Sequence, residues 1–416
     1  MTGHDLQRIL GVTRQIARNV ELPAVLDAVI EAGRAVTDAE RGSVFLHDAD
    51  AGELFMFVGT GVETRTIRIP ADTGIAGETA QTRTAINIPD CYADPRFHAD
   101  TDKATGFVTR NMLSVPLLGI DGELVGVLQL LNHTDGPFEQ HHQQLAEALA
   151  DQAGVALQRA RLLEDRMARQ RLEQEISIAR QIQEDVLPKA LPTVRGYALA
   201  AEAEPAEETG GDIYDLIPLP DGRLCVFLAD ATGHGVGPAL SVTQARSMLR
   251  VALRLDAQPA ELLREINAQL TADLSTMRFI TAFIGLLDPA THTMHYAAAG
   301  QAPLILLAAD GIADVRDATL MPLGIMEELP ADDDAMPFEA TFEFGLGDTL
   351  LLLTDGFFEA QDPAGNELGH DVLIEQAKST ADVDAMLKQL RDTVADHVAG
   401  GQQADDQTAV LLQRVE

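Results

Sequence analysis

Residues 208–237, ETGGDIYDLIPLPDGRLCVFLADATGHGVG, are the stretch from which the fold of this chain is most readily inferred. Two runs rich in β-forming residues, 213–219 and 224–229, flank a Pro-Asp-Gly sequence at 220–222. Strand-forming runs on either side of such a turn are typical of a β-hairpin. We therefore expect two antiparallel, neighbouring strands of a β-sheet here.

Acidic residues stand at the open end of this predicted hairpin. Asp212 precedes the first run and Asp230 closes the second. In an antiparallel hairpin the start of one strand lies beside the end of the next, so both carboxylates reach the same edge of the sheet. Glycines, which permit close backbone approach, surround them at positions 210, 211, 233, 235 and 237. Two adjacent carboxylates repel each other unless a cation lies between them. The alternative interpretation is a solvated hairpin with acidic ends.

The length and composition indicate a multidomain protein with aliphatic cores. The chain has 416 residues, enough for two or three domains, and 46% are hydrophobic but only 4% aromatic. Its two cysteines, Cys91 and Cys225, lie far apart and lack a metal-ligand spacing. A disulfide framework and a zinc site are therefore not expected, and a reducing cytoplasm is the natural setting.

Charge and hydropathy limit the classes of partner. The formal net charge of −35 argues against nucleic acid and against anionic membranes as partners. Residues 1–10 show no signal-peptide core, and no apolar run is long enough to span a bilayer. We expect a cytoplasmic protein that binds neither nucleic acid nor membrane.

Helix and strand patterns alternate in the N-terminal third. Helical spacing of apolar residues covers 4–20 and 22–37, and a further helix is expected to start at the glycine-flanked residues 73–77. Strand-like runs occur at 42–46, 54–58, 66–69, 111–118 and 123–132. This order predicts an α/β or α+β module of the size of a sensor domain, with one central sheet.

Several short motifs in this region resemble the GAF domain. They occur in one order: GSVFL at 42–46, GIAGETA at 74–80, INIPD at 86–90, TGFVTRNMLSVPL at 105–117 and VGVLQLLN at 125–132. The resemblance covers residues 21–160 and leaves 1–20 as a separate N-terminal helix. It implies a small-ligand sensor or a dimerisation module, and the ligand is left undefined. Asn132 and Phe138 resemble the Asn-Lys…Phe signature of cyclic-nucleotide-binding members, with His133 in the place of Lys.

A long helix is expected between the two halves of the chain. From 138 to 187 there is no proline and only one glycine, Gly154, which is typical of a coiled coil or an interdomain rod. Apolar residues repeat at alternating spacings of four and three: Leu149, Ala153, Ala156, Ala160, Leu163 and Met167. The apolar stripe then slips and resumes at Leu172, Ile176, Ala179, Ile182 and Val186. The pattern predicts a helical coiled-coil linker over 161–192 in a homodimer; the alternative is two shorter helices that pack on their own domains.

Strands dominate the C-terminal half. Besides the hairpin, strand patterns occur at 197–203, 279–287, 293–298, 303–308, 339–344, 349–354 and 408–413. Helical patterns fall between them at 237–255, 259–274, 371–379 and 383–398. Runs of strands with segregated pairs of helices predict an α+β layered sandwich over 193–416, with two sheets inside and helices outside.

Two further strand ends in this half carry acidic residues. The apolar run 350–354 leads directly into Asp355, and the flexible stretch 400–404 leads into Asp405 and Asp406. Together with the hairpin, four strand ends thus present carboxylates. Such hard oxygen ligands, without cysteine, favour Mg²⁺ or Mn²⁺ over Zn²⁺. Two of these ions about 3.5–4 Å apart can activate a shared water and neutralise a phosphoryl oxygen.

The acidic motifs also resemble the metal-dependent PPM family of serine/threonine protein phosphatases, in its bacterial SpoIIE/RsbU branch. The matching motifs are GGDIYD (210–215), LADATGHG (228–235), AGQAP (299–303), PLGI (322–325), TDGFFEA (354–360) and DDQT (405–408). The resemblance implies an α/β-β/α sandwich that binds two Mn²⁺ or Mg²⁺ ions. It also implies that water attacks phosphoserine or phosphothreonine directly, without a phosphoenzyme.

By this resemblance, each acidic residue has a role. The implied catalytic residues are Asp212, Asp230, Asp355 and Asp405, and the implied metal ligands are these four with Ala231 and Asp406. Asp230 would bridge both ions, with the carbonyl of Ala231 as a further ligand, and Asp212 would bind the second ion. Asp355 and Asp405 would complete the first site, with Asp406 as the alternative to Asp405.

Two other positions in these motifs bear on the chemistry. His234 is a candidate general acid for the leaving oxygen, although a role in structuring the loop backbone is favoured. Gln301 stands where the SpoIIE/RsbU branch commonly has His or Asn.

Taken together, the sequence predicts a homodimeric, cytoplasmic sensor phosphatase. The resemblance to the RsbU branch implies a phosphorylated anti-anti-sigma protein of the STAS type as substrate, in partner-switching control of transcription. A first alternative is a non-catalytic PPM scaffold that binds such a partner, against which the filled acidic positions argue. A second is a nucleotide-processing enzyme gated by the GAF domain, but the His/Asp clusters of phosphodiesterases are missing from the sequence.

Overall fold

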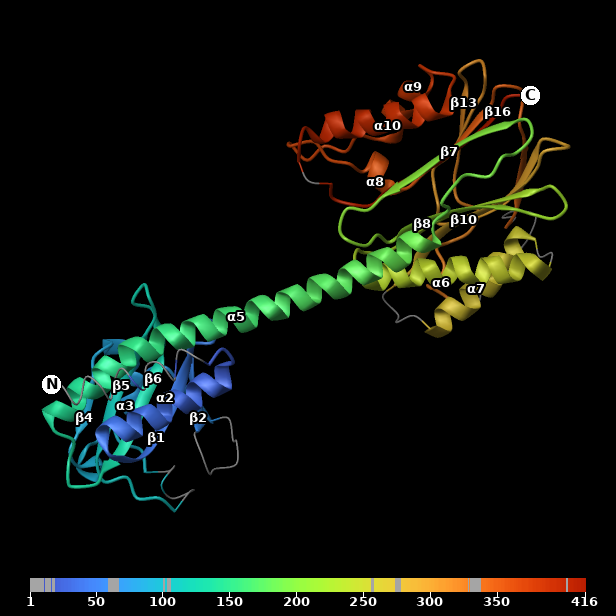
Figure 1. The fold of residues 1–416 in the computed structure, drawn as a ribbon. Coiled ribbons are helices and arrows are strands. Elements are labelled where there is room, and N and C mark those ends of the chain that lie inside the picture. Colours follow the sequence, from blue (N-terminus) through green and yellow to red (C-terminus); the bar gives the residue numbers. More distant parts are fainter. Residues whose placement is uncertain are drawn as a thin grey trace. The chain divides into compact units, whose positions relative to one another are not determined.

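The computed structural model describes the chain apart from residues 1–10, 12–15, 17–18, 59–66, 100–101, 103–105, 256–257, 274–277, 328, 330–337 and 402. The chain forms two compact units, Met1–Leu172 and Glu173–Glu416 (Figure 1). The predicted N-terminal helix at 1–20 lies almost entirely outside the described residues. Within the part of the chain that the structure describes, no helix has both the length and the apolar character needed to cross a bilayer.

The first unit is built on one antiparallel sheet. Its elements are α2 (Leu22–Thr37), β1 (Ala39–Asp48), β2 (Glu53–Val58), β3 (Ile67–Pro70), α3 (Gly74–Thr82), β4 (Ile86–Ile88), the 3₁₀ turn η1 (Cys91–Ala93), β5 (Met112–Leu118), β6 (Leu124–His133) and the start of α5 (Gln140–Val186). The strands lie in the order β3-β2-β1-β6-β5-β4. The helix expected at 22–37 and the strands expected from the sequence patterns are confirmed.

Alternate side chains of the central strands point to opposite faces of this sheet. Val44 and Leu46 of β1 pack with α2 and α5, whereas Phe45 between them packs with α3. This arrangement follows from the two-residue period of a strand. Helices cover both faces, which confirms the predicted module with a single central sheet.

Helix α5 is continuous over 47 residues, as the scarcity of helix-breaking residues predicts. However, Leu149, Ala153 and Ala160, which belong to the expected coiled-coil seam, are buried in the core of the first unit with α2 and the sheet. This part of the seam therefore packs on its own unit instead of on a second helix. A helix packed on a sheet and a helix in a coiled coil share the same spacing of apolar residues, so the sequence pattern does not separate them. Further along α5, Met167 and Leu172 are exposed.

The second unit contains two five-stranded sheets. Its elements are β7 (Tyr197–Glu204), β8 (Asp212–Pro218), β9 (Leu224–Ala231), α6 (Val236–Ala252), the 3₁₀ turn η2 (Leu253–Leu255), α7 (Pro259–Asp273), β10 (Ile280–Asp288), β11 (Thr293–Ala299), β12 (Leu304–Leu307), β13 (Ala313–Arg316), β14 (Ala340–Glu343), β15 (Thr349–Leu353), α8 (Asp355–Phe358), α9 (His370–Ala377), α10 (Val383–Val398) and β16 (Gln407–Arg414). One sheet has the order β14-β11-β10-β9-β8, and the other has the order β13-β12-β15-β16-β7.

The two sheets are the inner layers of a sandwich. Their facing sides enclose an apolar core that includes Leu228 of the first sheet and Leu352 and Val410 of the second. Helices α6 and α7 cover the outer side of the first sheet, and α8, α9 and α10 cover the outer side of the second. Figure 1 shows α6 with α7, and α9 with α10, on opposite sides of the strands. The predicted α+β layered sandwich is confirmed; β13 and the short α8 are additions that the sequence patterns did not indicate.

Candidate active site

The hairpin of β8 and β9 places two acids opposite each other. Asp212 and Asp230 are direct partners in the antiparallel register, at the end of the hairpin away from its turn. Tyr214 and Leu228 pack in the core between the two sheets. Because side chains two residues apart on a strand share a face, Asp212 and Asp230 face this same inter-sheet space. The predicted hairpin is thus confirmed, and its two acids lie where the apolar filling of the sandwich ends.

The second sheet brings buried hydroxyl groups to the same end of the sandwich. Leu352 and Val410 face the inter-sheet core, and Thr354 and Thr408 are two residues away from them on the same side. Oγ1 of Thr354 donates a 2.8 Å hydrogen bond to Oδ2 of Asp212 and accepts one of 2.9 Å from the backbone N–H of Thr408. The hydrogen bond between Thr354 and Asp212 therefore links the two sheets.

The two remaining predicted catalytic acids lie next to strands of this second sheet. Asp355 is the first residue of α8, directly after Thr354, and is partly buried. Asp405 lies just before β16 and is exposed, and its Oδ1 accepts a 2.8 Å hydrogen bond from the backbone N–H of Asp406. The chain thus brings acids from three separate segments to one end of the inter-sheet space.

Asp406 has a different role from its neighbour. Its side chain is buried and accepts hydrogen bonds from the backbone N–H groups of Ala206, at 2.7 Å, and of Gly211. These bonds fasten the segment before β8 to the start of β16. Both oxygens of this carboxylate are used within the protein, which favours Asp405 over Asp406 as the ligand.

Burial and mutual repulsion raise the pKa values of the acids. Burial, together with the carboxylates of Asp355 and Asp405, raises the pKa of Asp230 to about 7. Burial and Asp405 raise the pKa of Asp355 to about 6. Burial and Asp230 raise the pKa of Asp212 well above its ordinary value. The charges that act most strongly on these three groups are all carboxylates, so the groups share one negatively charged space.

The chemistry of this donor set fits divalent cations. Buried carboxylates that raise one another's pKa values carry negative charge that a hard, oxygen-liganded cation relieves. Among the described residues, no three His, Cys, Asp or Glu side chains already form a cage for a metal ion. The fit therefore rests on the kind, burial and charge of these residues and not on a finished coordination shell.

The backbone around Ala231 packs so closely on the loop before β8 that residues 210 and 211 have no room for a side chain. The N–H of Ala231 donates a 3.0 Å hydrogen bond to the carbonyl of Gly211. A β-carbon on Gly211 would lie 2.6 Å from the carbonyl oxygen of Ala231, and one on Gly210 would lie 2.9 Å from the carboxylate of Asp406. The Gly-Gly pair before Asp212 is therefore required by the close approach of these three segments.

Several residues hold the site together through contacts with distant parts of the chain. Asp215 is fully buried on β8, accepts hydrogen bonds of 2.6 and 2.9 Å from Arg250 and lies 2.7 Å from Nε of Arg246. Gln301 donates a 2.9 Å hydrogen bond to the carbonyl of Leu353 and so links the two sheets. These contacts join residues far apart in the sequence, 35 positions for Asp215 and Arg250, and depend on the tertiary register.

A polar cavity of about 320 Å³ lies next to the acids. Its lining residues are Ala206, Glu207, His234, Gln403 and Ala404. Nδ1 of His234 lies 3.1 Å from Oε2 of Glu207, and both side chains are exposed. His234 thus lies at the rim of this cavity and pairs with a residue of the loop before β8.

The GAF signature residues are used within the first unit. Oδ1 of Asn132 accepts a 2.7 Å hydrogen bond from the N–H of Arg110, and its Nδ2 donates one of 2.9 Å to the carbonyl of Val108. His133 packs against Phe138, with ring centroids 5.6 Å apart. Asn132 therefore holds the loop before β5.

Both cysteines are free thiols in buried positions. Burial raises the pKa of Cys91 to about 12 and also raises the pKa of Cys225. A thiol that stays protonated is a poor nucleophile and a poor metal ligand. Cys91 and Cys225 form no disulfide with each other in this structure.

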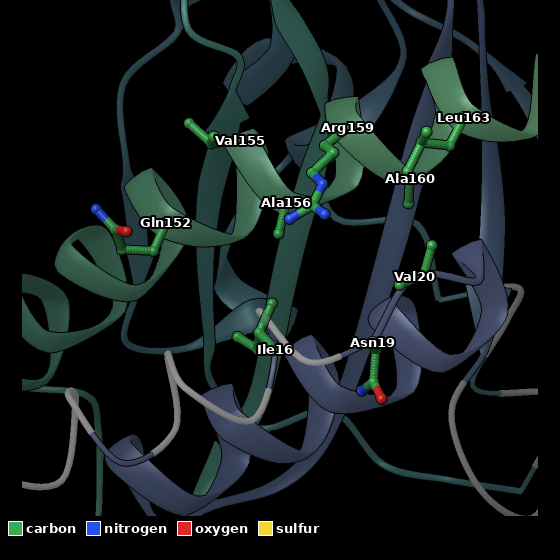
Figure 2. Close-up of a pocket in the computed structure, with 9 residues that line it drawn as sticks. All are labelled: Ile16, Asn19, Val20, Gln152, Val155, Ala156, Arg159, Ala160 and Leu163. Carbon is green, nitrogen blue, oxygen red and sulfur yellow. The ribbon is translucent and has the colours of Figure 1, made fainter. Parts of the chain in front are cut away.

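A second cavity, of about 140 Å³, lies in the first unit between α5 and residues near the N-terminus of the chain. Figure 2 shows its lining side chains, Ile16, Asn19 and Val20 on one side and Gln152, Val155, Ala156, Arg159, Ala160 and Leu163 of α5 on the other. Clefts that hold drug-sized ligands usually measure about 300–1,000 Å³. This small cavity therefore indicates no ligand class for the first unit.

Both units match models of known families. Residues 220–415 match the family described as Stage II sporulation protein E (SpoIIE). Residues 21–157 match the GAF domain.

Curated relatives match parts of the chain. The probable 3',5'-cyclic phosphodiesterase pde-5 of Caenorhabditis elegans is 35% identical over 167 residues, which are 37% of this chain and 23% of that protein. Protein IcfG of Synechocystis is 27% identical over 271 residues, which are 58% of this chain and 41% of that protein. The chain thus spans less than half the length of either relative.

Solved structures of similar fold include domains of two bacterial proteins. The SiaA-PP2C domain of Pseudomonas aeruginosa is 21% identical with a TM-score of 0.49, and the match covers 59% of this chain and 98% of that chain. The RsbU and RsbW domains of a Mycobacterium tuberculosis protein are 28% identical with a TM-score of 0.47, and the match covers 55% and 62%. On these two matches, the N-terminal unit contains a GAF domain and the C-terminal unit contains a domain of the SpoIIE type.

Proposed function

We propose that this chain is a metal-dependent protein serine/threonine phosphatase whose activity is regulated by its GAF domain. The observation that carries the proposal is the convergence of four aspartates at one end of the sandwich, with the pKa of Asp230 raised to about 7 by burial and its acidic neighbours. The match of the C-terminal unit to the SpoIIE family supports the same chemistry. Phosphatases of the PP2C family are metal-dependent and generally use Mn²⁺ or Mg²⁺.

In this proposal, the four aspartates are the side-chain ligands of two cations. Asp230 would be shared by both ions, Asp212 would hold one, Asp355 and Asp405 would hold the other, and the Ala231 carbonyl would be a further ligand. When bound, such ions act as Lewis acids that lower the pKa of water and neutralise charge on a phosphoryl group.

The chain's own hydrogen bonds orient these ligands. The Thr354 hydroxyl holds one oxygen of Asp212 at 2.8 Å. Asp406 holds the segment before β8 through the N–H of Ala206, at 2.7 Å. Carboxylates fixed in this way keep their orientation as charge develops on the substrate.

We propose a phosphorylated anti-anti-sigma protein of the STAS type as the substrate, in a partner-switching pathway. The match to the SpoIIE family supports a protein substrate, and the cavity of about 320 Å³ beside the acids, bordered by Glu207 and His234, offers space for residues that flank a phosphoserine. The rival proposal is a non-catalytic scaffold of the same fold. The presence of all four acids favours the enzyme.

We also propose that the protein is a homodimer, formed through the GAF domain and the exposed part of α5. On this helix, Leu172 and Ile182, two residues of the predicted apolar stripe, are each more than half exposed. Apolar side chains at this spacing on a long helix are more stable when they pack against a second helix.

Turnover of phosphorylated substrates tests the proposed function. The full chain with Mn²⁺ should hydrolyse p-nitrophenyl phosphate and a phosphoserine STAS protein, and a chelator should abolish both activities. Asp230→Asn should lower kcat at least about a hundredfold, because it replaces the bridging carboxylate. Asp221→Asn, the same change at the turn of the same hairpin, should keep wild-type activity. A folded wild-type chain that binds Mn²⁺ and phosphoprotein without turnover would establish the scaffold instead.

A further inference from the structure

The last turns of α5 reach the loop that precedes Asp212. The carboxamide of Gln183 donates a 2.7 Å hydrogen bond from Nε2 to the carbonyl of Gly210 and accepts one of 3.2 Å at Oε1 from the N–H of the same residue. The same Nε2 lies 3.5 Å from the carbonyl oxygen of Asp212. One side chain thus satisfies both backbone groups of Gly210, in the way a neighbouring strand would satisfy them.

The loop held by Gln183 has little freedom to move elsewhere. On its other side, the N–H groups of Ala206 and Gly211 bind the buried carboxylate of Asp406. A β-carbon on Gly210 would lie 2.9 Å from that carboxylate, so the backbone there is already in close contact. A loop packed in this way transmits a displacement at Gly210 to Asp212, two residues further along, because little slack lies between them.

The end of α5 is itself anchored in the phosphatase domain. Val186 packs on the core beneath α6 and α7, and Leu187 packs on that core and on the core between the sheets. By contrast, Arg180 and Glu208 also connect α5 to the loop, but they are 3.8 Å apart with exposed side chains. A solvent-exposed pair of this kind contributes little. Gln183 is therefore the contact of this turn that bears most directly on the loop.

We propose that Gln183 is a positioning residue of the active site, which makes the end of the interdomain helix part of the metal-binding machinery. The proposal rests on the proposed function, in which Asp212 is a metal ligand. Gln183 does not touch the reacting atoms. It fixes the backbone from which Asp212 projects, so a change in the position or rotation of this turn of α5 displaces Asp212.

Gln183→Met tests this role because methionine keeps the length and helix preference of glutamine but makes neither hydrogen bond. Gln181→Met, at an exposed position two residues earlier on the same helix, is the matched control. Both variants are made in the full chain, and Mn²⁺ binding is measured by isothermal titration calorimetry. Turnover of p-nitrophenyl phosphate is measured over a range of Mn²⁺ concentrations.

The expected result is a loss of Mn²⁺ affinity on the order of tenfold in Gln183→Met, as found when outer-shell partners of metal ligands are removed. Turnover should recover at high Mn²⁺ with an unchanged KM for the phosphorylated substrate, and Gln181→Met should match the wild type. A role confined to stability would lower the Tm of the metal-free chain and leave the Mn²⁺ affinity intact. Wild-type Mn²⁺ affinity in folded Gln183→Met overturns the proposal.

A second variant covers the case in which Gln183→Met does not fold. Gln183→Glu keeps an acceptor for the N–H of Gly210 and loses the donor to its carbonyl, so it should also weaken Mn²⁺ binding; unaltered binding would contradict the role. If the wild-type chain neither binds Mn²⁺ nor shows turnover, the proposed function fails. If the wild type binds and turns over while both Gln183 variants behave like it, only the role of Gln183 fails.

Discussion

The hydroxyl of Thr354, at the end of β15 in one sheet, donates a 2.8 Å hydrogen bond to Oδ2 of Asp212, the first residue of β8 in the other sheet. The same hydroxyl accepts a 2.9 Å hydrogen bond from the N–H of Thr408. One buried oxygen atom therefore links the starts or ends of three strands. This link lies where the apolar core between the sheets changes into the acidic site.

Replacement of Thr354 by valine should destabilise the domain. The change keeps the volume of the side chain but leaves the N–H of Thr408 and one oxygen of Asp212 without their partner, which costs about 1–3 kcal/mol. Urea unfolding of the metal-free chain measures this loss. Thr349→Val, a buried threonine at the other end of the same strand, is the control, and equal losses in the two variants would contradict the special role of Thr354.

The stability of the metal-free protein should fall as the pH rises toward neutrality. Folding raises the pKa of Asp230 to about 7 and that of Asp355 to about 6, from an ordinary value of 3.8. A carboxyl group that binds its proton more tightly in the folded state stabilises that state at low pH, and this stabilisation is lost as the pH rises through the folded-state pKa. With a chelator present, the Tm should therefore decrease from about pH 5 to about pH 8, and Mn²⁺ should restore it at the upper end.

Asp230→Asn provides the control for this pH dependence. The asparagine carries no titrating proton and removes one charge from its acidic neighbours, so the decrease in Tm should become shallower. A wild-type Tm that is flat or rising over the same range would show that the acids do not repel one another as described.

Two glycine positions should respond in opposite ways to alanine. A β-carbon on Gly356 would overlap the carbonyl oxygen of Asp406, which belongs to the backbone and has no room to move. Gly356→Ala should therefore cost about 1–3 kcal/mol. At Gly237, in the first turn of α6, the nearest atoms belong to the flexible guanidinium of Arg278, so alanine should be neutral or stabilising by up to about 1 kcal/mol. Chemical denaturation of both variants checks the difference, and similar effects at both positions would contradict it.

A charge on the exposed apolar face of α5 should disrupt the proposed homodimer. Leu172 is 58% exposed, and Leu172→Asp places a carboxylate where a second helix would pack. Light scattering coupled to size-exclusion chromatography should show a dimer for the wild type and a monomer for the variant. Gln174→Asp, about 200° around the helix, should remain dimeric. A monomeric wild-type chain would end the dimer proposal.

The sequence predicted the parts of the site that depend on local patterns. The hairpin with Asp212 and Asp230 could be predicted because strand runs, a turn and acids at the ends all lie within thirty residues. The sandwich could be predicted because its strands have continuous apolar runs and its helices have separate amphipathic patterns. Whether the four aspartates act as metal ligands remains a prediction.

The contacts that position these acids could not be predicted in the same way. Gln183 and Gly210 meet only because the end of α5 packs on the C-terminal unit, and Asp215 contacts Arg246 and Arg250 only when α6 packs on the hairpin. A glutamine on a polar helix and an arginine on an amphipathic one have no distinguishing local pattern. The prediction that Leu149 belongs to a coiled-coil seam was wrong for a related reason. The same spacing of apolar residues occurs in a helix that packs on a sheet and in a helix that packs on a partner helix.

The register between β8 and β9 also protects the site against a particular error in folding. A slip of one residue would send every side chain of β9 to the opposite face, so that Asp230 would point toward α6 and its apolar neighbours would lose their core. Leu228 and Asp230 share a face, so the packing that stabilises the sandwich and the charge that serves the chemistry are gained or lost together. A mis-paired hairpin therefore cannot persist as a well-packed but inactive protein, and the stable molecules in a population are those with correctly aligned acids.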